Sequence, residues 1–324
     1  MNPTSNDSIP AQQDRFAIVS DKQLGDVTLL EPTTRLLKAR SGQPTALFVN
    51  EAFRPLVELM PDATWGPDLK ERFGCLWATS WSSRVIMRGW KVRARRRCLL
   101  VNQERHVRWW YRLLYSQVQI TSIRDEYWSH YFWRALGGEP EAFRSPQLLQ
   151  PPESWRHPEL PEGPFVLINP TAAWPNKYWQ PESWVQLMQG ETSIKGLPWV
   201  MTGGGSAVER EHCAAIASAA PSGLVDLAGK TSLKQYLHAL SRASLVLCVD
   251  GAASHLAQAF GVPAITLFGP VYPAKWHWPT PKHRSLSAFF LSEARPLLTS
   301  TITPETVVSE VNNLLREFPE IIQP

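Results

Sequence analysis

The stretch Leu245–Pro270, LVLCVDGAASHLAQAFGVPAITLFGP, decides the fold. It opens with an apolar run typical of a buried strand, and a turn follows at Asp250-Gly251. A short helical pattern comes next, stops at Gly261-Val262-Pro263 and leads into a second apolar run. Strand, glycine turn, helix and strand make one βαβ step of a parallel sheet. Such a turn leaves backbone N–H groups unpaired at the helix start, which suits a phosphate.

Composition is that of an ordinary soluble globular protein. The 324 residues are 44% hydrophobic and 19% charged, enough for two domains. No apolar run approaches the ~18 residues of a membrane span, and the first fifteen residues lack the pattern of a signal peptide. The four cysteines are scattered, which disfavours a structural zinc or a disulfide framework and suits a reducing cytoplasm.

Proline density marks the domain boundary. Six prolines lie between Pro146 and Pro164, where they disfavour both helix and sheet. We therefore expect a disordered tail at 1–15, an N-terminal acceptor-binding domain at 16–145, a linker at 146–164, a nucleotide-binding domain at 165–302, and a C-terminal helix at 303–324 that packs back on the N-terminal domain. Two such α/β domains would face each other across a cleft at their strand carboxyl ends, the usual ligand location.

The two halves differ in regularity. The first half predicts a strand at 16–20, a helical stretch with a kink or an irregular first turn at Pro32, a strand at 46–49 and a helix at 51–59. Residues 65–138 are rich in Arg and Trp, with an irregular pattern and helices near 104–115 and 125–136. The second half predicts strands at 165–169, 199–202, 245–247 and 264–268, and helices at 181–189, 208–219, 232–241 and 307–318.

Several short motifs follow the predicted strands. They are Gln23-Leu-Gly-Asp26, Asn169-Pro-Thr-Ala-Ala-Trp-Pro-Asn-Lys-Tyr-Trp179, Thr202-Gly-Gly-Gly205 with Glu209, Asp226-Leu-Ala-Gly-Lys-Thr-Ser-Leu233 and Asp250-Gly-Ala-Ala-Ser-His255. Any one of them is weak evidence, because glycine turns at strand ends are common. Together, in this order and spacing, they resemble the ADP-heptose:lipopolysaccharide heptosyltransferases, glycosyltransferase family 9. The resemblance covers residues 16–59 and 165–278.

The resemblance implies a GT-B fold of two Rossmann-like domains. It also implies an inverting, metal-independent enzyme, without a cofactor, that moves a heptose from an ADP-activated donor to a lipopolysaccharide inner-core acceptor. Gly251-Ala252 departs from the Ser/Thr-Gly that the family prefers, so a hydroxyl near the phosphates is missing. The alternatives are the same fold with another nucleotide sugar or a protein acceptor, and a catalytically inactive nucleotide-sugar-binding protein.

Two residues are candidates for the chemistry. Sugar transfer requires a base for the acceptor hydroxyl and positive charge against the departing diphosphate. Asp26 resembles the family's aspartate and is the candidate base, while the alternative is that it only caps the following helix. Lys177 is the candidate cation, with a solvated surface lysine as its alternative.

A second group is expected to bind the nucleotide sugar. Glu209 suits the ribose hydroxyls, because a carboxylate accepts bonds from a diol, or it stabilises a helix dipole. Thr171 adds a hydroxyl to the phosphates or caps the turn, and His255 donates to phosphate or packs in the core. Asp250 orders the loop or holds a sugar hydroxyl. The full predicted set is Thr171, Gly203, Gly204, Glu209, Thr231, Asp250, Gly251, Ala252 and His255, with no metal ligands.

A basic stretch follows the first strands. Arg84–Arg112 holds ten Lys or Arg residues and one acid, Glu104, interleaved with Trp90, Trp109 and Trp110. Such a run is often only a solvated face, but Arg beside Trp suits a lipid-linked anionic oligosaccharide and an anionic membrane surface. The expected acceptor contacts are Arg84, Arg88, Arg93 and Arg96. Nucleic acid is the competing partner, and a net charge of only +4 argues against it. We therefore expect a cytoplasmic protein held peripherally at the inner face of the inner membrane.

Overall fold

The computed structural model describes residues 15–66, 70–101, 104–120, 126–192, 194, 196–291 and 298–323. The chain forms two compact units. The first comprises residues 1–22, 30–124 and 132–143, and the second comprises residues 23–29, 125–131 and 144–324. Residues 23–29 and 125–131, which we expected in the N-terminal domain, thus group with the C-terminal unit. The tail expected at 1–15 lies, apart from Arg15, outside the described residues.

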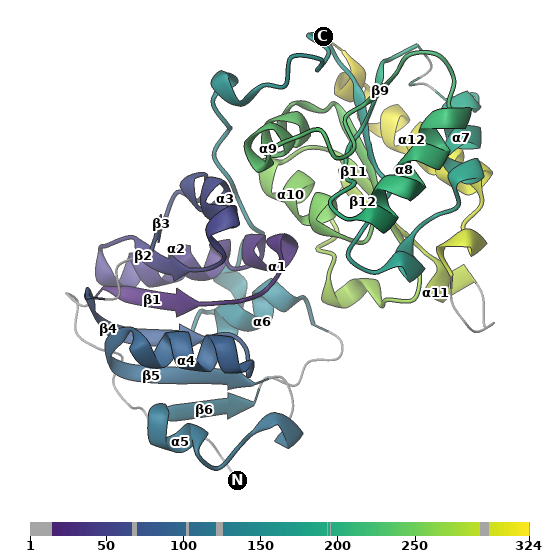
Figure 1. Ribbon diagram of the computed structural model, residues 1–324. Helices are drawn as coiled ribbons and strands as arrows, with labels where there is room; N and C mark the ends of the chain where they lie inside the picture. The colour runs from purple at the N-terminus through teal and green to yellow at the C-terminus, as the bar shows by residue number, and fades with distance from the viewer. Residues whose placement is uncertain are drawn as a thin grey trace. The chain divides into compact units, whose positions relative to one another are not determined.

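A parallel sheet forms the centre of the N-terminal unit. Within the described residues it has six strands in the order β3-β2-β1-β4-β5-β6 (Figure 1). The strands are β1 (Phe16–Val19), β2 (Thr45–Phe48), β3 (Ala63–Trp65), β4 (Arg72–Ala78), β5 (Arg93–Val101) and β6 (Gln117–Ile120). Every residue of β1 and β2 is buried, as expected for central strands covered by helices on both faces.

Helices connect these strands. They are α2 (Glu31–Ser41), α3 (Arg54–Glu58), α4 (Ser83–Lys91), α5 (Tyr111–Leu114) and, further along the chain, α6 (Trp128–Ala135). The buried sides of α4 and α5 pack on one face of the sheet through Val85, Ile86, Tyr111 and Tyr115. The Tyr115 hydroxyl also donates to the Ile86 carbonyl at 2.9 Å, which ties the two helices together.

The structure corrects one expectation for this unit and resolves another. The described residues between 65 and 138 are not irregular, because β4, α4, β5, α5 and β6 continue the β/α alternation. The first half of β5 is rich in arginine and lacks the apolar pattern of a strand, although its second half is buried. Of the two outcomes expected at Pro32, there is no kink within one helix, and Pro32 lies in the first turn of α2, separate from α1 (Leu24–Thr28). Proline is tolerated there because first-turn N–H groups need no helical partner.

The C-terminal unit contains a second parallel sheet. Its described strands run in the order β12-β11-β10-β7-β8-β9. They are β7 (Val166–Asn169), β8 (Trp199–Met201), β9 (Leu224–Asp226), β10 (Leu245–Val249), β11 (Ala264–Phe268) and β12 (His283–Ser287). The sequence did not predict β9 and β12. Strand β9 consists of three half-buried residues, and β12 has the polar sequence HRSLS.

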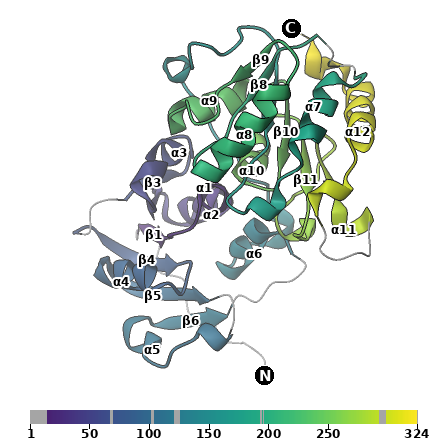
Figure 2. The same cartoon turned by 45° about the vertical axis from the view of Figure 1, so that its right-hand side comes forward.

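Helices cover this second sheet on both faces (Figure 2). They are α7 (Pro181–Gln189), α8 (Ala207–Ala219), α9 (Leu233–Arg242), α10 (Ala252–Phe260), α11 (Ala288–Leu291) and α12 (Pro304–Glu317). Helix α12 lies beside α7 and buries Val307, Val311 and Leu314 in a core that includes Trp184. Its apolar face is therefore occupied by the core of its own unit, and packing of this helix on the N-terminal domain stays a prediction.

The linker at 146–164 contains one 3₁₀ turn, Glu153–Trp155, and no α-helix or strand among its described residues. The Leu148 N–H donates to the Ala259 carbonyl at the end of α10, at 2.8 Å. A search of the described residues finds no helix with the length and apolar character needed to cross a membrane.

Candidate functional site

A pocket of about 550 Å³ lies at the carboxyl edge of the second sheet, entirely within the C-terminal unit. Its size is typical of small-molecule sites. The residues that line it follow β7, β8 and β10 or come from α1, α9 and α10. They are Gln23, Leu24, Gly25, Asp26, Asn169, Thr171, Ala172, Ala173, Trp174, Lys177, Gly203, Gly205, Glu209, Thr231, Ser232, Leu233, Tyr236, Asp250, Gly251, Ala252, His255, Val271 and Trp276.

Helix α10 opens its N-terminus into this pocket. Gly251 precedes the helix in extended conformation, and within the described residues no side chain caps the first N–H groups. A Cβ at Gly251 would lie 3.3 Å from the Ala172 Cβ, so the glycine fits a tight approach of two loops. Uncapped N–H groups and the helix dipole together attract an anion. The start of α10 is thus a suitable place for a phosphate.

Lys177 stands beside that helix start. Its Nζ lies 2.6 Å from Asp250 Oδ2, and the two side chains are 15% and 4% exposed. The ammonium also lies 4.9 Å from the centre of the Trp174 ring. Burial raises the pKa of Asp250, whereas the charge and hydrogen bond of Lys177 lower it. Burial is the larger of these effects, so the pKa of Asp250 lies above its usual value and Lys177 offsets part of the shift. Lys177 itself is not a solvated surface residue.

Distant residues fix the Lys177 loop. The Thr299 hydroxyl donates to the Lys177 carbonyl at 2.9 Å. Two residues further, the Trp179 indole donates to the Ile302 carbonyl at 2.8 Å, and Trp179 is fully buried. The Tyr178 hydroxyl donates to the Ala172 carbonyl at 3.0 Å. Bonds on three consecutive residues thus hold the 3₁₀ turn Pro175–Lys177 and its cation in place.

Glu209 organises the opposite wall of the pocket. Its carboxylate accepts hydrogen bonds from the Thr171 hydroxyl at 3.2 Å, the Gly205 N–H at 3.1 Å and the Ser206 hydroxyl at 3.2 Å. Ser206 caps α8, and Glu209 lies in the first turn of that helix. Gly203 has a φ of +120°, and a Cβ there would lie 2.5 Å from Thr171 Oγ1. Glu209 therefore stabilises the helix start and the Gly203–Gly205 turn while it lines the pocket.

Asp26 reaches the pocket from α1. The residue is partly buried in the first turn of this helix, whose N-cap is Gln23, and the N-cap of α2 is Leu30. The alternative in which Asp26 only caps a helix is therefore wrong. Its neighbour Gly25 packs on α10, since a Cβ at Gly25 would lie 2.8 Å from His255 Cδ2 and 3.2 Å from the Ala252 Cα. This contact sets the position of α1 within the C-terminal unit.

Two histidines near the pocket are kept neutral. His255 is buried on α10, and burial, assisted by the Lys177 charge, lowers its pKa to about 4. Burial likewise lowers the pKa of His277 to about 4, and its Nε2 lies 3.2 Å from the His283 carbonyl. A neutral imidazole still carries one N–H, so His255 retains the ability to donate to a phosphate.

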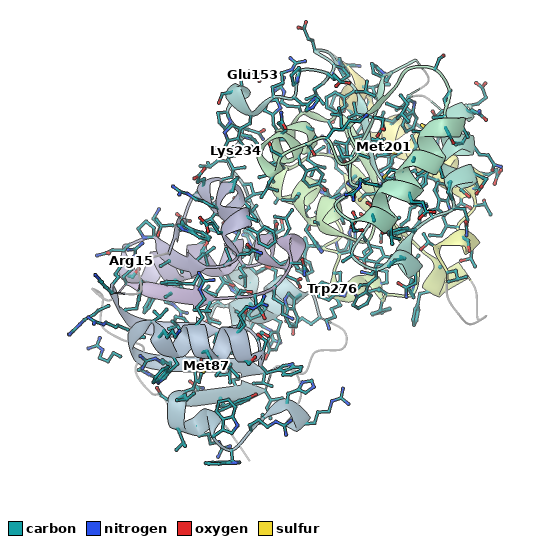
Figure 3. All side chains as sticks on the ribbon, in the orientation of Figure 1. Arg15, Met87, Glu153, Met201, Lys234 and Trp276 are labelled. Atoms are coloured by element: carbon teal, nitrogen blue, oxygen red, sulfur yellow. The ribbon has the colours of Figure 1, made fainter. Side chains whose placement is uncertain are left out.

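Most of the predicted binding residues line this one pocket. Gly204 is the exception. It turns away with a φ of +77°, and a Cβ there would meet the Gly229 backbone at 2.8 Å. The sequence did not indicate the walls formed by Tyr236 and Trp276, because aromatic residues carry no motif of their own. Figure 3 labels Trp276. Among the described residues, no three His, Cys, Asp or Glu side chains gather as metal ligands.

The four arginines predicted for the acceptor belong to the N-terminal unit and do not form one patch. Arg84 is exposed in the first turn of α4, and Arg88 donates to the Val49 carbonyl at 3.1 Å, just after β2. Arg93 and Arg96 lie in the first half of β5, paired with Arg72 and Cys75. The two pairs thus occupy opposite ends of the strands, and acceptor binding by these residues stays a prediction.

Comparison with known proteins identifies the family. The model of glycosyltransferase family 9 (heptosyltransferase) matches residues 77–296. The chain belongs to glycosyltransferase family 9. Lipopolysaccharide heptosyltransferase 1 of Pseudomonas aeruginosa is 31% identical over 117 residues, which are 35% of this chain and 31% of that protein. The matched stretch therefore spans about a third of the curated relative's length.

Solved structures share the fold of this family 9 protein. A family 9 glycosyltransferase from Veillonella parvula superposes with a TM-score of 0.80 at 17% identity, covering 96% of this chain and 100% of that one. Heptosyltransferase II of E. coli gives 0.74 at 19% identity, covering 94% and 99%. E. coli heptosyltransferase WaaC, solved with ADP-2-deoxy-2-fluoro heptose, gives 0.66 at 17% identity, covering 92% and 99%. The predicted GT-B class and family are thus confirmed.

The neutral histidines predict an acid-sensitive family 9 protein. Each imidazole takes up a proton more readily on unfolding, because its pKa rises from about 4 in the folded state to its ordinary value of 6.5. They therefore have no effect on stability well above pH 6.5, and they favour unfolding progressively as the pH falls from 6.5 toward 4. We expect each histidine to remove roughly 2 kcal/mol of unfolding free energy between pH 7 and pH 5.

Urea unfolding across this pH range measures the effect. His255→Gln and His277→Gln should each reduce the number of protons taken up on unfolding by about one, and the double variant by about two. The slope of the unfolding free energy against pH should fall accordingly. A His255→Gln variant with the wild-type pH slope would contradict the assignment to His255.

Proposed function

We propose that this family 9 protein is an inverting glycosyltransferase that moves a heptose from ADP-heptose to an anionic, lipid-linked acceptor of the lipopolysaccharide inner core. The observation that carries the proposal is the pairing of Lys177 with the uncapped start of α10 in one pocket. A fixed cation beside free N–H groups suits the diphosphate of a nucleotide sugar. The relatives support the choice of sugar, since they are heptosyltransferases and one of them was solved with an ADP-heptose analogue.

The proposed reaction uses groups already in the pocket. Asp26 takes the proton of the acceptor hydroxyl as its oxygen attacks the anomeric carbon. The bond from that carbon to the phosphate oxygen breaks on the opposite side, and ADP leaves with the electron pair. Lys177 and the α10 N–H groups stabilise the charge that grows on the diphosphate. One displacement of this kind inverts the anomeric centre, and protein groups supply the positive charge.

Donor binding and turnover test the proposal. Calorimetry with ADP-, UDP- and GDP-sugars should give measurable binding only for the ADP-sugar, and ADP release should require acceptor and persist in EDTA. Preferential binding of a UDP- or GDP-sugar would show that the donor is not an ADP-sugar. Binding of the ADP-sugar without ADP release or sugar transfer would favour the alternative of a catalytically inactive nucleotide-sugar-binding protein. The departure from the family pattern at Gly251-Ala252 is the reason to consider that alternative.

Lys177 acts on the diphosphate by charge, beyond holding its loop. Lys177→Ala alone would leave the buried Asp250 carboxylate unpaired, which costs several kcal/mol. We therefore choose the double variant Lys177→Met/Asp250→Asn, which removes both charges. It should melt near wild type but turn over about 100-fold more slowly at saturating donor.

Lys282→Ala is the matched control, since this lysine pairs with Glu320 and does not line the pocket. Near-normal turnover of the double variant would show that the ion pair only shapes the loop.

Asp26→Asn isolates the proposed base. The amide keeps the size of the side chain but cannot take the acceptor proton at neutral pH. Turnover should fall by about 100-fold or more, with little change in ADP-sugar affinity. Asp62→Asn serves as the control, because that carboxylate pairs with Lys38 and does not line the pocket. If Asp26→Asn retains most of the turnover with both substrates saturating, the base is another residue.

A further inference from the structure

One side of the N-terminal unit exposes several large apolar residues. Trp109 is 79% exposed and Leu113 is 73% exposed, in and just before α5. On α4, Met87 and Trp90 are 44% and 49% exposed, one turn apart, and Figure 3 labels Met87 on this helix. Apolar residues of this size gathered at one place mark an interaction site, whereas single ones do not.

Two hydrogen bonds link the segments that carry these residues. The Tyr115 hydroxyl donates to the Ile86 carbonyl at 2.9 Å, and the Tyr111 hydroxyl donates to the Trp81 carbonyl at 3.4 Å. Trp81, itself 43% exposed, stacks on His106 with ring centres 4.2 Å apart. We call the outward side of the two helices the α4–α5 face. Its apolar members are Trp81, Met87, Trp90, Trp109 and Leu113.

Cations surround these apolar side chains. Arg84, Lys91, Arg105, Arg108 and Arg112 are all exposed. Residues 72–120 contain a single acid, Glu104. Beyond the C-terminal end of α4, Arg72, Arg93, Arg95 and Arg97 line a pocket of about 560 Å³, and Arg97 donates to the Val92 carbonyl that ends the helix. The α4–α5 face thus carries an excess of positive charge, with Asp21, which accepts a hydrogen bond from the Ser82 hydroxyl at the start of α4, as an acidic neighbour.

We propose that the α4–α5 face docks on the surface of an anionic phospholipid bilayer. Trp and Leu side chains favour the boundary between headgroups and acyl chains, and each Lys or Arg near an anionic surface contributes about 1 kcal/mol. Nucleic acid fits this face less well, because Met87 and Leu113 offer no ring on which bases stack. This proposal rests on the proposed function in one respect: a lipid-linked acceptor lies in such a membrane surface, which gives the enzyme a reason to bind there.

Sedimentation with lipid vesicles tests the docking on the full chain. The protein should bind phosphatidylcholine vesicles that contain phosphatidylglycerol, release them at high salt and bind pure phosphatidylcholine vesicles weakly. Arg108→Gln/Arg112→Gln should weaken binding about 30-fold, the effect of two surface cations. Trp109→Ser/Leu113→Ser should weaken it at least tenfold through lost apolar burial.

Matched controls separate the face from general charge and apolarity. Leu149 is 53% exposed in the linker, and Arg316 is exposed on α12. Leu149→Ser and Arg316→Gln should bind vesicles as the wild type does. All variants should keep the wild-type melting temperature and ADP affinity, because the substituted residues are exposed and do not line the nucleotide pocket.

Three outcomes would overturn the docking. They are equal binding to neutral and anionic vesicles, wild-type vesicle binding by Trp109→Ser/Leu113→Ser, and binding to a single-stranded oligonucleotide in preference to vesicles. Failure of the proposed function is distinguishable, because vesicle binding would then persist without turnover. Conversely, turnover of a soluble acceptor without vesicle binding would reject the docking alone.

Discussion

The pocket depends on one buried ion pair, Lys177 with Asp250. Asp250 directly follows β10, and Lys177 ends a 3₁₀ turn more than seventy residues earlier, so the pair joins two loops at the edge of the sheet. Neither charge is stable alone at this depth, since an unpaired buried charge costs several kcal/mol. The pair also brings an ammonium to the start of α10, where the helix dipole already favours anions. The same ion pair thus joins the two loops and places the cation where an anionic ligand would bind.

The sequence predicted the C-terminal unit well because its strands are apolar and its turns carry glycine. Helix α7 was predicted with its exact bounds, and β10 and β11 within two residues. The failures have physical reasons. The arginines of β5 masked its periodicity, and β12 is polar although it pairs with β11 along five residues. Strands of this kind depend on neighbours that a local pattern does not contain.

The site was predictable only where chemistry needs a particular residue type. Charged and glycine positions such as Lys177, Asp250 and Gly203 followed from motifs, and they do line one pocket. The walls at Tyr236 and Trp276 required the fold, because aromatic residues usually signal core packing. The membership of α1 in the C-terminal unit was also invisible, since it depends on the close approach of Gly25 to His255.

The bonds from Thr299 to the Lys177 loop and from Trp179 to Ile302 span more than 120 residues. During synthesis, the loop that holds Lys177 therefore emerges well before the segment that secures it. At ribosomal rates this interval is on the order of ten seconds. The sheet strands β7 to β11 emerge before Thr299 and Ile302, so the cation is locked in place only after the sheet around it has been synthesised. Competence to hold a diphosphate thus follows formation of the sheet and does not accompany it.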